Sequence, residues 1–289
     1  MPLTKDEKRR LEETADRLRR LCLKTVVWAH SGHIGGSLSA MDLLTILYHK
    51  YMKIDPKNPN WEDRDRLIIS KGHIGVAHAP ILADLGYIDP ELLRDFNLTG
   101  SSLGIHLDSN KVPGVDCSTG SLGHGLSLAA GLALASRLSG RNYKVYCLVG
   151  DGESNEGSIW EAAMAIAQYK LTGLITFVDH NRFMMDGAVE EVMGIEPLED
   201  KWRAFGFDTR RINGHNFDEL AGAIDAGLAA AEQGGTAKPV CVICETVKGC
   251  GIDFMENNRH WHYGALNDEN VAAAEKSLDA HLAKRLEAL

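Results

Sequence analysis

The chain of 289 residues carries a formal net charge of -9, and 44% of its residues are hydrophobic and 25% charged. This balance is typical of a soluble globular enzyme with one large core. The acidic excess gives no reason to expect a nucleic-acid partner, because phosphate backbones are bound through clustered Lys and Arg. The only basic clusters lie on the first helix, where we expect a solvated, salt-bridged face. They comprise Arg9, Arg10, Arg17, Arg19 and Arg20, interleaved with Glu12, Glu13 and Asp16.

No run of 18 apolar residues occurs, and the N-terminus lacks the apolar stretch of a signal peptide. We therefore expect no membrane span and a cytoplasmic protein. The six cysteines are expected to be reduced, because a chain of this size needs no disulfide staples. Cys241 and Cys244 lie three apart in an apolar run typical of a strand, so they should face opposite sides of a sheet as core thiols rather than share a metal.

The first helix is predicted by a capping box, Thr4 and Glu7, followed by apolar residues at helical spacing. Strands alternating with helices along the rest of the chain indicate an α/β fold, a doubly wound and mainly parallel sheet with helices on both faces. We expect one domain over residues 1–289. The further helical patterns cover residues 39–52, 75–85, 122–138, 157–170, 216–232 and 268–286, and the strand-like runs cover 66–70, 144–149, 174–179, 207–212 and 240–246.

Polar segments repeatedly follow the predicted strands. In open α/β sheets ligands bind beyond the carboxyl ends of the strands, so these segments should meet at one edge of the sheet. They are Lys71-Gly72-His73, Gly150-Asp151-Gly152, Asp179-His180-Asn181 and Lys248-Gly249.

Asp151 and Asn181 end two of these strands, with 27 residues between Gly152 and His180. A carboxylate and a carboxamide side by side suit a hard divalent cation, and Mg²⁺ usually completes its coordination with waters and phosphate oxygens. The predicted ligand is a metal-bound diphosphate. The alternative is that the Asp serves a strand-to-helix turn and the Asn a cap.

A glycine-rich segment, residues 116–125, precedes the helix predicted over 122–138. Glycines before a helix let backbone amides approach a ligand, and the helix N-terminus favours negative charge. The segment matches neither the Rossmann nor the Walker pattern. It is expected to form a second wall of the cofactor cleft, although glycine in this position is often only turn chemistry.

From about Leu11 to Leu266 the sequence closely resembles the N-terminal, diphosphate-binding part of transketolase. The resemblance is carried by four motifs in the family's order: Gly32-His33-Ile34-Gly35, Ser70-Lys71-Gly72-His73, Thr119-Gly120-Ser121-Leu122-Gly123, and Gly150-Asp151-Gly152 with Asn181.

The resemblance implies thiamine diphosphate and Mg²⁺ as cofactors, with Ca²⁺ or Mn²⁺ able to substitute. Asp151, Asn181 and the backbone carbonyl of Phe183 would hold the metal. It implies catalytic roles for His33, His73, His106 and His262, which would supply hydrogen bonds and proton transfers around the sugar hydroxyls. The implied cofactor-binding residues are His73, Gly120, Leu122, Gly150, Asp151, Gly152, Glu156, Asn181 and His262. In the family, the acidic residue that matches Glu156 lies at the subunit interface and connects two cofactor sites. The alternative is that Glu156 is only a glutamate at a helix N-terminus, where negative charge is favourable.

The chain departs from the family pattern at the later histidines. Ile105 precedes His106 where Pro-Gly-His is usual, and Tyr263 displaces the glycine that usually follows Trp-His. His260 competes with His262 for the role of the late histidine. His124 stands where glutamine is common. These departures concern recognition of the donor sugar rather than the metal site.

The family's pyrimidine-binding and C-terminal domains have no counterpart in the chain, and the glutamate that activates the cofactor belongs to the former. The chain is therefore expected to be the N-terminal subunit of a split transketolase of the pentose phosphate pathway, with two copies of it and two of a separately encoded partner. It would transfer a two-carbon glycolaldehyde unit from a ketose phosphate to an aldose. The alternatives are a split ketol transferase for a sulfonated or branched sugar, a deoxyxylulose phosphate synthase-like fragment, and a noncatalytic regulatory binding module.

Overall fold

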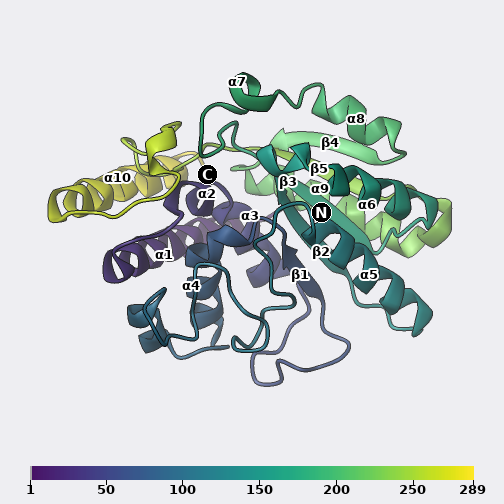
Figure 1. Cartoon of the computed structure of the whole chain (residues 1–289), viewed down its shortest axis with the longest axis horizontal. Helices are drawn as coiled ribbons and strands as arrows, with labels where there is room; N and C mark the ends of the chain where they lie inside the picture. The colour runs from purple at the N-terminus through teal and green to yellow at the C-terminus, as the bar shows by residue number, and fades with distance from the viewer. Residues whose placement is uncertain (1) are drawn as a thin grey trace.

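Five parallel strands form the central sheet of the computed structural model, which describes residues 2–289 (Figure 1). The strand order is β1-β2-β3-β5-β4. The residues of β2 and β3 are all buried, which explains why these strands are continuous apolar runs rather than alternating ones. The bounds are β1 Arg66–Ile69, β2 Val145–Gly150, β3 Leu174–His180, β4 Asp208–Asn213 and β5 Val240–Glu245.

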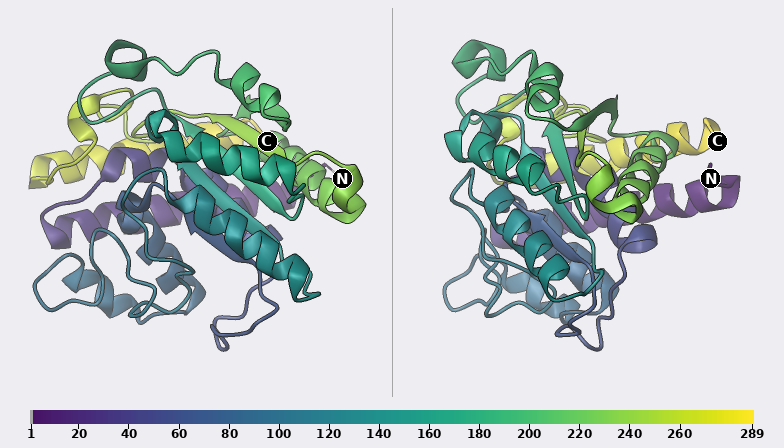
Figure 2. Two further views of the ribbon diagram at one scale, coloured as in Figure 1. Left: turned by 45° about the vertical axis from the view of Figure 1, so that its right-hand side comes forward. Right: turned by 90° about the vertical axis from the view of Figure 1, so that its right-hand side faces the viewer.

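Helices cover both faces of the sheet, and each layer encloses its own hydrophobic cluster. The first layer contains α1 (Lys5–Ala29), α2 (Ile34–Ser39), α3 (Met41–Ile46), α4 (Gly75–Leu85), α9 (Phe217–Gln233) and α10 (Asp268–Glu287). The second contains α5 (Gly125–Leu138), α6 (Gly157–Gln168) and α8 (Leu198–Ala204). In the left view of Figure 2 the teal helices α5 and α6 lie in front of the sheet, with purple α1 and yellow α10 behind it.

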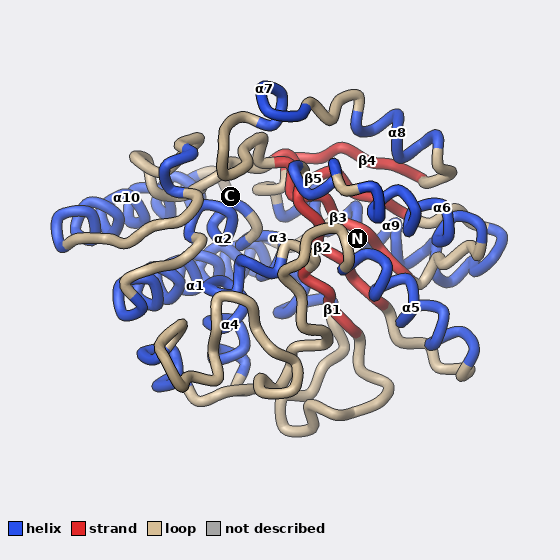
Figure 3. Tube along the Cα trace, viewed as in Figure 1, coloured by secondary structure: helices blue, strands red, loops and turns tan. Residues whose placement is uncertain are grey.

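The predicted fold class is confirmed, and every predicted strand is present (Figure 3). The helix expected over 39–52 is present as α3 followed by a π-helical turn, Leu47–Tyr51. The helix expected from residue 122 begins at Gly125, because Gly123 has a φ of 84° and cannot belong to a right-handed helix. Three helices had no predicted counterpart, α2, α7 (Val189–Met193) and α8. All three are too short to show a clear periodicity.

The capping box of α1 is confirmed. The Thr4 side chain accepts a hydrogen bond from the backbone N–H of Glu7, and the Glu7 carboxylate accepts one from the backbone N–H of Thr4. The prediction of a solvated arginine face is wrong for Arg19, which is only 1% exposed. The reason is tertiary: α1 lies between α3, α4 and α10, so part of its charged surface is covered.

Arg19 is held by a buried carboxylate. Its guanidinium donates two hydrogen bonds to Asp42, at 3.0 and 2.7 Å, and Asp42 is fully buried. Nδ1 of His215 lies 2.7 Å from the same carboxylate, while its Nε2 accepts from the backbone N–H of Val247. Cys250 completes a group of potential metal ligands with Asp42 and His215. Both imidazole nitrogens and both carboxylate oxygens are already engaged, so this cluster joins elements rather than binding a cation.

The cysteines behave as predicted. Cys241 belongs to the hydrophobic cluster on the α5 side of the sheet, and Cys244 belongs to the cluster on the α1 side. Their thiols therefore cannot share a metal. All six cysteines are free thiols. Within residues 2–289, no helix combines the length and the apolar character needed to cross a bilayer.

Replacing Asp42 by alanine should lower the free energy of unfolding by about 3–5 kcal/mol, because the substitution leaves the buried Arg19 guanidinium without its counter-charge. The matched control is Asp279→Ala. Asp279 also pairs with an arginine of α1, Arg20 at 2.8 Å, but its side chain is 74% exposed. The control should cost at most about 1 kcal/mol. Urea denaturation of the two variants measures the difference, and equal losses would contradict the assignment.

Candidate active site

A cleft of about 440 Å³ lies at the carboxyl edge of the sheet. It is formed where the segments after β1, β2, β3 and β5 meet, as the positions of the polar motifs predicted. Its lining includes the predicted site residues His33, His73, Gly120, Leu122, Gly150, Asp151, Gly152, Glu156, Asn181, Phe183 and His262.

Asp151 is the first residue after β2, and it is 3% exposed. Its carboxylate accepts backbone hydrogen bonds from Gly152 at 2.7 Å and from Arg182 at 2.5 Å. Burial, together with the nearby charge of Asp179, raises the pKa of Asp151 to about 6. Because burial disfavours the ionised form of this carboxyl group, a cation bound beside it would stabilise that form.

Asn181 follows β3 and has a fixed orientation. Its Nδ2 donates to Asp179 at 2.9 Å and to the Ser39 hydroxyl at 3.2 Å, while its Oδ1 accepts from the backbone N–H of Phe183 at 3.2 Å. Phe183 lines the cleft, and its carbonyl accepts a hydrogen bond from Lys248 at 2.9 Å. The carboxylate of Asp151, the carboxamide oxygen of Asn181 and this carbonyl form a set of hard oxygen donors.

Two buried lysines in the cleft were not among the predicted site residues. Lys71 is 2% exposed and Lys248 is 1% exposed. The Nζ of Lys248 lies 2.7 Å from Nδ1 of His262, and burial, with the charge of Lys71, lowers the pKa of Lys248 to about 8. Their position directly after strands was the sequence signal that could have identified them, because a lysine buried at a ligand-binding edge needs an anionic partner.

Three predicted catalytic histidines lie together in the cleft. The ring centroids of His33 and His73 are 5.0 Å apart, and that of His262 lies 5.3 Å from His33 and 5.5 Å from His73. Burial is the main cause that lowers their pKa values, to about 4 for His33, about 2 for His73 and about 3 for His262. Neighbouring cations add to the effect, Lys71 for His73 and Lys248 for His262. All three imidazoles are therefore neutral at pH 7.

The remaining predicted histidines lie outside the cleft wall. His106 is exposed and covers Gly120, where an added Cβ would lie 2.6 Å from the imidazole. His260 is exposed on the turn Arg259–Trp261 and does not line the cleft, whereas His262 does. The geometry thus favours His262 over His260 as the histidine of the cleft. His124 is the exposed residue before α5.

Glu156 and Glu153 both line the cleft, but they differ in burial and in hydrogen bonding. Glu156 is an exposed residue at the N-terminus of α6, and its side chain makes no capping hydrogen bond. Glu153 is 3% exposed and accepts backbone hydrogen bonds from Gly123 and Gly150, both at 2.9 Å. Glu153 therefore ties the glycine-rich segment to the turn after β2, and it was not predicted.

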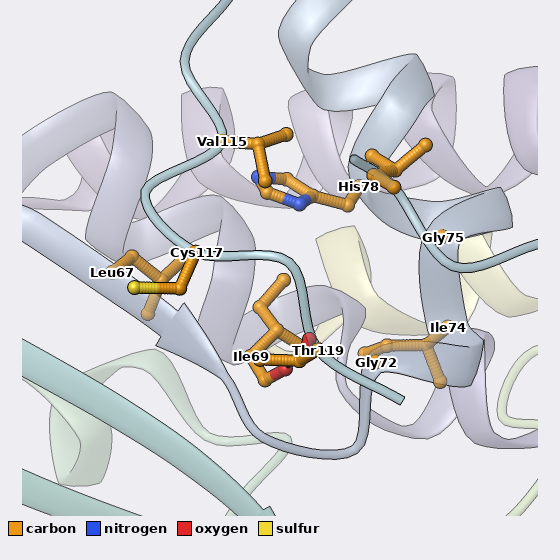
Figure 4. Close-up of a pocket in the computed structure, with 10 residues that line it drawn as sticks. Leu67, Ile69, Gly72, Ile74, Gly75, His78, Val115, Cys117 and Thr119 are labelled. Carbon is orange, nitrogen blue, oxygen red and sulfur yellow. Dashed lines mark hydrogen bonds between the residues drawn. The ribbon is translucent and has the colours of Figure 1, made fainter. Parts of the chain in front are cut away.

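A much smaller cavity is lined by residues that include Gly72, His78, Cys117 and Thr119 (Figure 4). Its volume of about 10 Å³ is at the lower limit for one water molecule. His78, one of its lining residues, is buried, with its Nε2 2.7 Å from the Tyr48 hydroxyl. This space cannot accept a cofactor, so the large cleft is the candidate site.

The residues of the cleft fit a metal-bound diphosphate. Mg²⁺ prefers oxygen donors of the kinds that Asp151, Asn181 and Phe183 offer, and it leaves positions for phosphate oxygens. Lys71 and Lys248 provide buried positive charge for a polyanion. The Nδ1 atom of His33 is buried and has no hydrogen-bond partner within residues 2–289, so it is available to a ligand.

Comparisons with known proteins agree with this site. The profile of the family described as transketolase, thiamine diphosphate binding domain, matches residues 11–287. A 6-deoxy-6-sulfo-D-fructose transketolase subunit of a Clostridium species is 44% identical over 93% of this chain and 96% of its own length. One of the apulose-4-phosphate transketolase subunits of Phocaeicola vulgatus is 38% identical over 95% of each chain. The crystal structure of Campylobacter jejuni transketolase superimposes with a TM-score of 0.86 and 30% identity over 95% of this chain.

Fold, cleft and matches together define a thiamine diphosphate-binding domain of the transketolase type. The chain belongs to the transketolase family, in the enzyme class of transferases that the family represents. It spans 45% of the length of the Campylobacter enzyme but nearly the whole length of the two relatives whose names contain the word subunit.

The three cleft histidines should remain neutral from pH 8 down to about pH 5, measured by NMR titration of histidines labelled at the imidazole. In Lys248→Met the pKa values of His262 and His33 should rise, because a nearby cation is lost, yet stay below the ordinary value, because burial persists. Since the unfolded chain takes up these protons near pH 6.5 and the native chain does not, stability should fall as the pH drops below that value. A protonated imidazole among the three at pH 7 would contradict this prediction.

Proposed function

We propose that the chain is the diphosphate-binding subunit of a two-chain transketolase that uses thiamine diphosphate and a divalent metal. The observation that carries the proposal is the meeting of three oxygen donors, from Asp151, Asn181 and Phe183, with the ammonium group of Lys248 in one cleft. The bound cofactor supplies the nucleophilic carbon that accepts a two-carbon unit from a ketose and passes it to an aldose.

In this proposal the metal ligands are Asp151, Asn181 and the carbonyl of Phe183, and Mg²⁺ is the expected ion, with Ca²⁺ or Mn²⁺ able to replace it. Lys248 lies close enough to the Phe183 carbonyl to face the same diphosphate. Gly120, Gly150 and Gly152 would bound the cofactor through their backbone, because they carry no side chain, and Leu122 lines the same cleft.

The histidines of the cleft orient the substrate and exchange protons with its hydroxyls. A neutral imidazole has one donor and one acceptor nitrogen, so His33, His73 and His262 can each donate a hydrogen bond or receive a proton at pH 7. Lys248 beside His262 disfavours its protonation. His106, whose imidazole covers Gly120, would contact the donor sugar in this proposal.

A separately encoded chain completes the site in this proposal. The protein aligns over almost the full length of relatives named as transketolase subunits, and over less than half of the single-chain transketolase of Campylobacter jejuni. The partner would contribute the pyrimidine-binding domain and the glutamate that activates the cofactor. We propose that residues 1–289 act as one domain, that the assembly contains two copies of each chain, and that Glu156 lies at the interface between them.

The sugar is a ketose with an anionic group, drawn from carbohydrate metabolism. A ketose phosphate of the pentose phosphate pathway is the general candidate. A sulfonated or branched sugar is favoured by the two relatives, whose names specify 6-deoxy-6-sulfo-D-fructose and apulose 4-phosphate. No observation favours a deoxyxylulose phosphate synthase-like reaction.

The substrate test uses this chain reconstituted with its C-terminal partner, thiamine diphosphate and Mg²⁺. Fructose 6-phosphate, 6-deoxy-6-sulfo-D-fructose and apulose 4-phosphate are compared as donors, with glyceraldehyde 3-phosphate as acceptor. We expect ketol transfer from at least one donor, with the preferred one showing a kcat/KM at least tenfold above the others. Failure to transfer a two-carbon unit from all three would overturn the proposal.

The variant test separates a catalytic chain from a noncatalytic binding module. Asp151→Ala should reduce both cofactor retention and ketol transfer of the reconstituted enzyme by at least about 100-fold, because it removes a metal ligand. Asp208→Ala, which changes an aspartate at the start of β4 that pairs with Arg210, is the matched control and should leave both unchanged. Equal activity of the two variants would support the noncatalytic alternative.

A further inference from the structure

Asp179, the penultimate residue of β3, is a fully buried carboxylate that the proposed chemistry does not use directly. Its Oδ2 accepts hydrogen bonds from the Ser39 hydroxyl at 2.7 Å, from Asn181 Nδ2 at 2.9 Å and from the ammonium of Lys71. Its Oδ1 accepts from the Thr246 hydroxyl. Four segments of the chain therefore converge on one carboxylate, from α2 and from the ends of β1, β3 and β5.

The carboxylate of Asp179 determines which way the Asn181 amide points. An ionised carboxylate accepts hydrogen bonds and cannot donate them. If the amide were rotated by half a turn, its oxygen would face the Asp179 oxygen and its NH₂ group would face the backbone N–H of Phe183. Both contacts would be repulsive, so the observed orientation directs Oδ1 away from Asp179.

Asp179 is surrounded by hydrogen-bond donors. The ammonium of Lys71 and the hydroxyls of Ser39 and Thr246 all donate to this carboxylate, so its oxygens act as acceptors. Lys71 donates in addition to the carbonyl of Gly36 at 3.0 Å, in the segment after His33 that lines the cleft. The anion, its counter-ion and two cleft walls thus form one hydrogen-bonded unit.

We propose that Asp179 is a positioning residue for the metal site: it holds the Asn181 carboxamide with its oxygen toward the cation. This inference rests on the proposed function, because it takes Asn181 as a metal ligand. Residues that orient the ligands of a metal typically contribute 10- to 100-fold to its affinity. Asparagine at position 179 would offer both a donor and an acceptor and would no longer select one orientation of Asn181.

The test is a double-mutant cycle on Mn²⁺ affinity, measured by electron paramagnetic resonance on the chain reconstituted with its partner and saturating thiamine diphosphate. D179N is combined with K71M, because D179N alone would leave a buried ammonium unpaired, whereas D179N/K71M conserves the net charge. We expect D179N/K71M to weaken Mn²⁺ binding 10- to 100-fold relative to the unmodified complex, and by less than about twofold when N181A is already present. Thermal unfolding confirms that each variant is folded.

A second pair of variants tests the positioning role of Asp179 if D179N/K71M does not fold. Ser39→Ala and Thr246→Val each remove one hydroxyl that donates to Asp179, but only the Ser39 hydroxyl also contacts Asn181. Ser39→Ala should weaken Mn²⁺ binding by at least about threefold and Thr246→Val by less than about twofold, since only the former loosens the Asn181 amide.

The outcomes separate this inference from the proposed function. Loss of Mn²⁺ affinity in D151A and N181A, combined with an equal effect of D179N whether or not Asn181 is present, would overturn the positioning role and leave the metal site intact. Equal effects of S39A and T246V would overturn it in the same way. Mn²⁺ binding that neither D151A nor N181A weakens, or no Mn²⁺ binding by the unmodified complex, would overturn both.

Discussion

The parallel register of β2, β3 and β5 is the constraint on which the site depends. Gly150 pairs with Asp179, and Asp179 pairs with Cys244, so the three strands end at nearly the same level. The residues that follow them therefore leave the sheet side by side, although they are distant along the chain. This arrangement brings Asp151, Asn181 and Lys248 to one cleft without a long excursion of any loop.

The cleft contains more buried charged groups than the packing of a sheet edge requires. Asp151 and Asp179 are buried carboxylates, and Lys71 and Lys248 are buried ammonium groups within the same edge. Removing such groups from water costs free energy unless each finds a partner, and sites of this kind in a cleft are typical of function. Lys71 and Asp179 compensate one another, whereas Asp151, with its raised pKa, and Lys248, with its lowered pKa, are the groups that a metal and a diphosphate would stabilise.

The buried ion pair of Arg19 and Asp42 differs from the charged groups of the cleft, because it joins elements of the fold. That pair is buried beside α10, and both oxygens of Asp42 and both nitrogens of His215 are engaged in hydrogen bonds within the chain. In the cleft, by comparison, the Nδ1 atom of His33 lacks a partner within residues 2–289. Completeness of hydrogen bonding, rather than the presence of charge, distinguishes the two clusters.

The sequence by itself determined the α/β class, all five strands, most of the helix positions and the edge at which the polar motifs meet. These features follow from periodicity and from glycine positions, which are properties of neighbouring residues. Only the tertiary structure decided that Arg19 is buried, that His262 rather than His260 lines the cleft, and that Lys71 pairs with Asp179. The physical reason is that burial and charge pairing arise between segments far apart in the chain, so no local pattern records which lysine, histidine or carboxylate will find its partner.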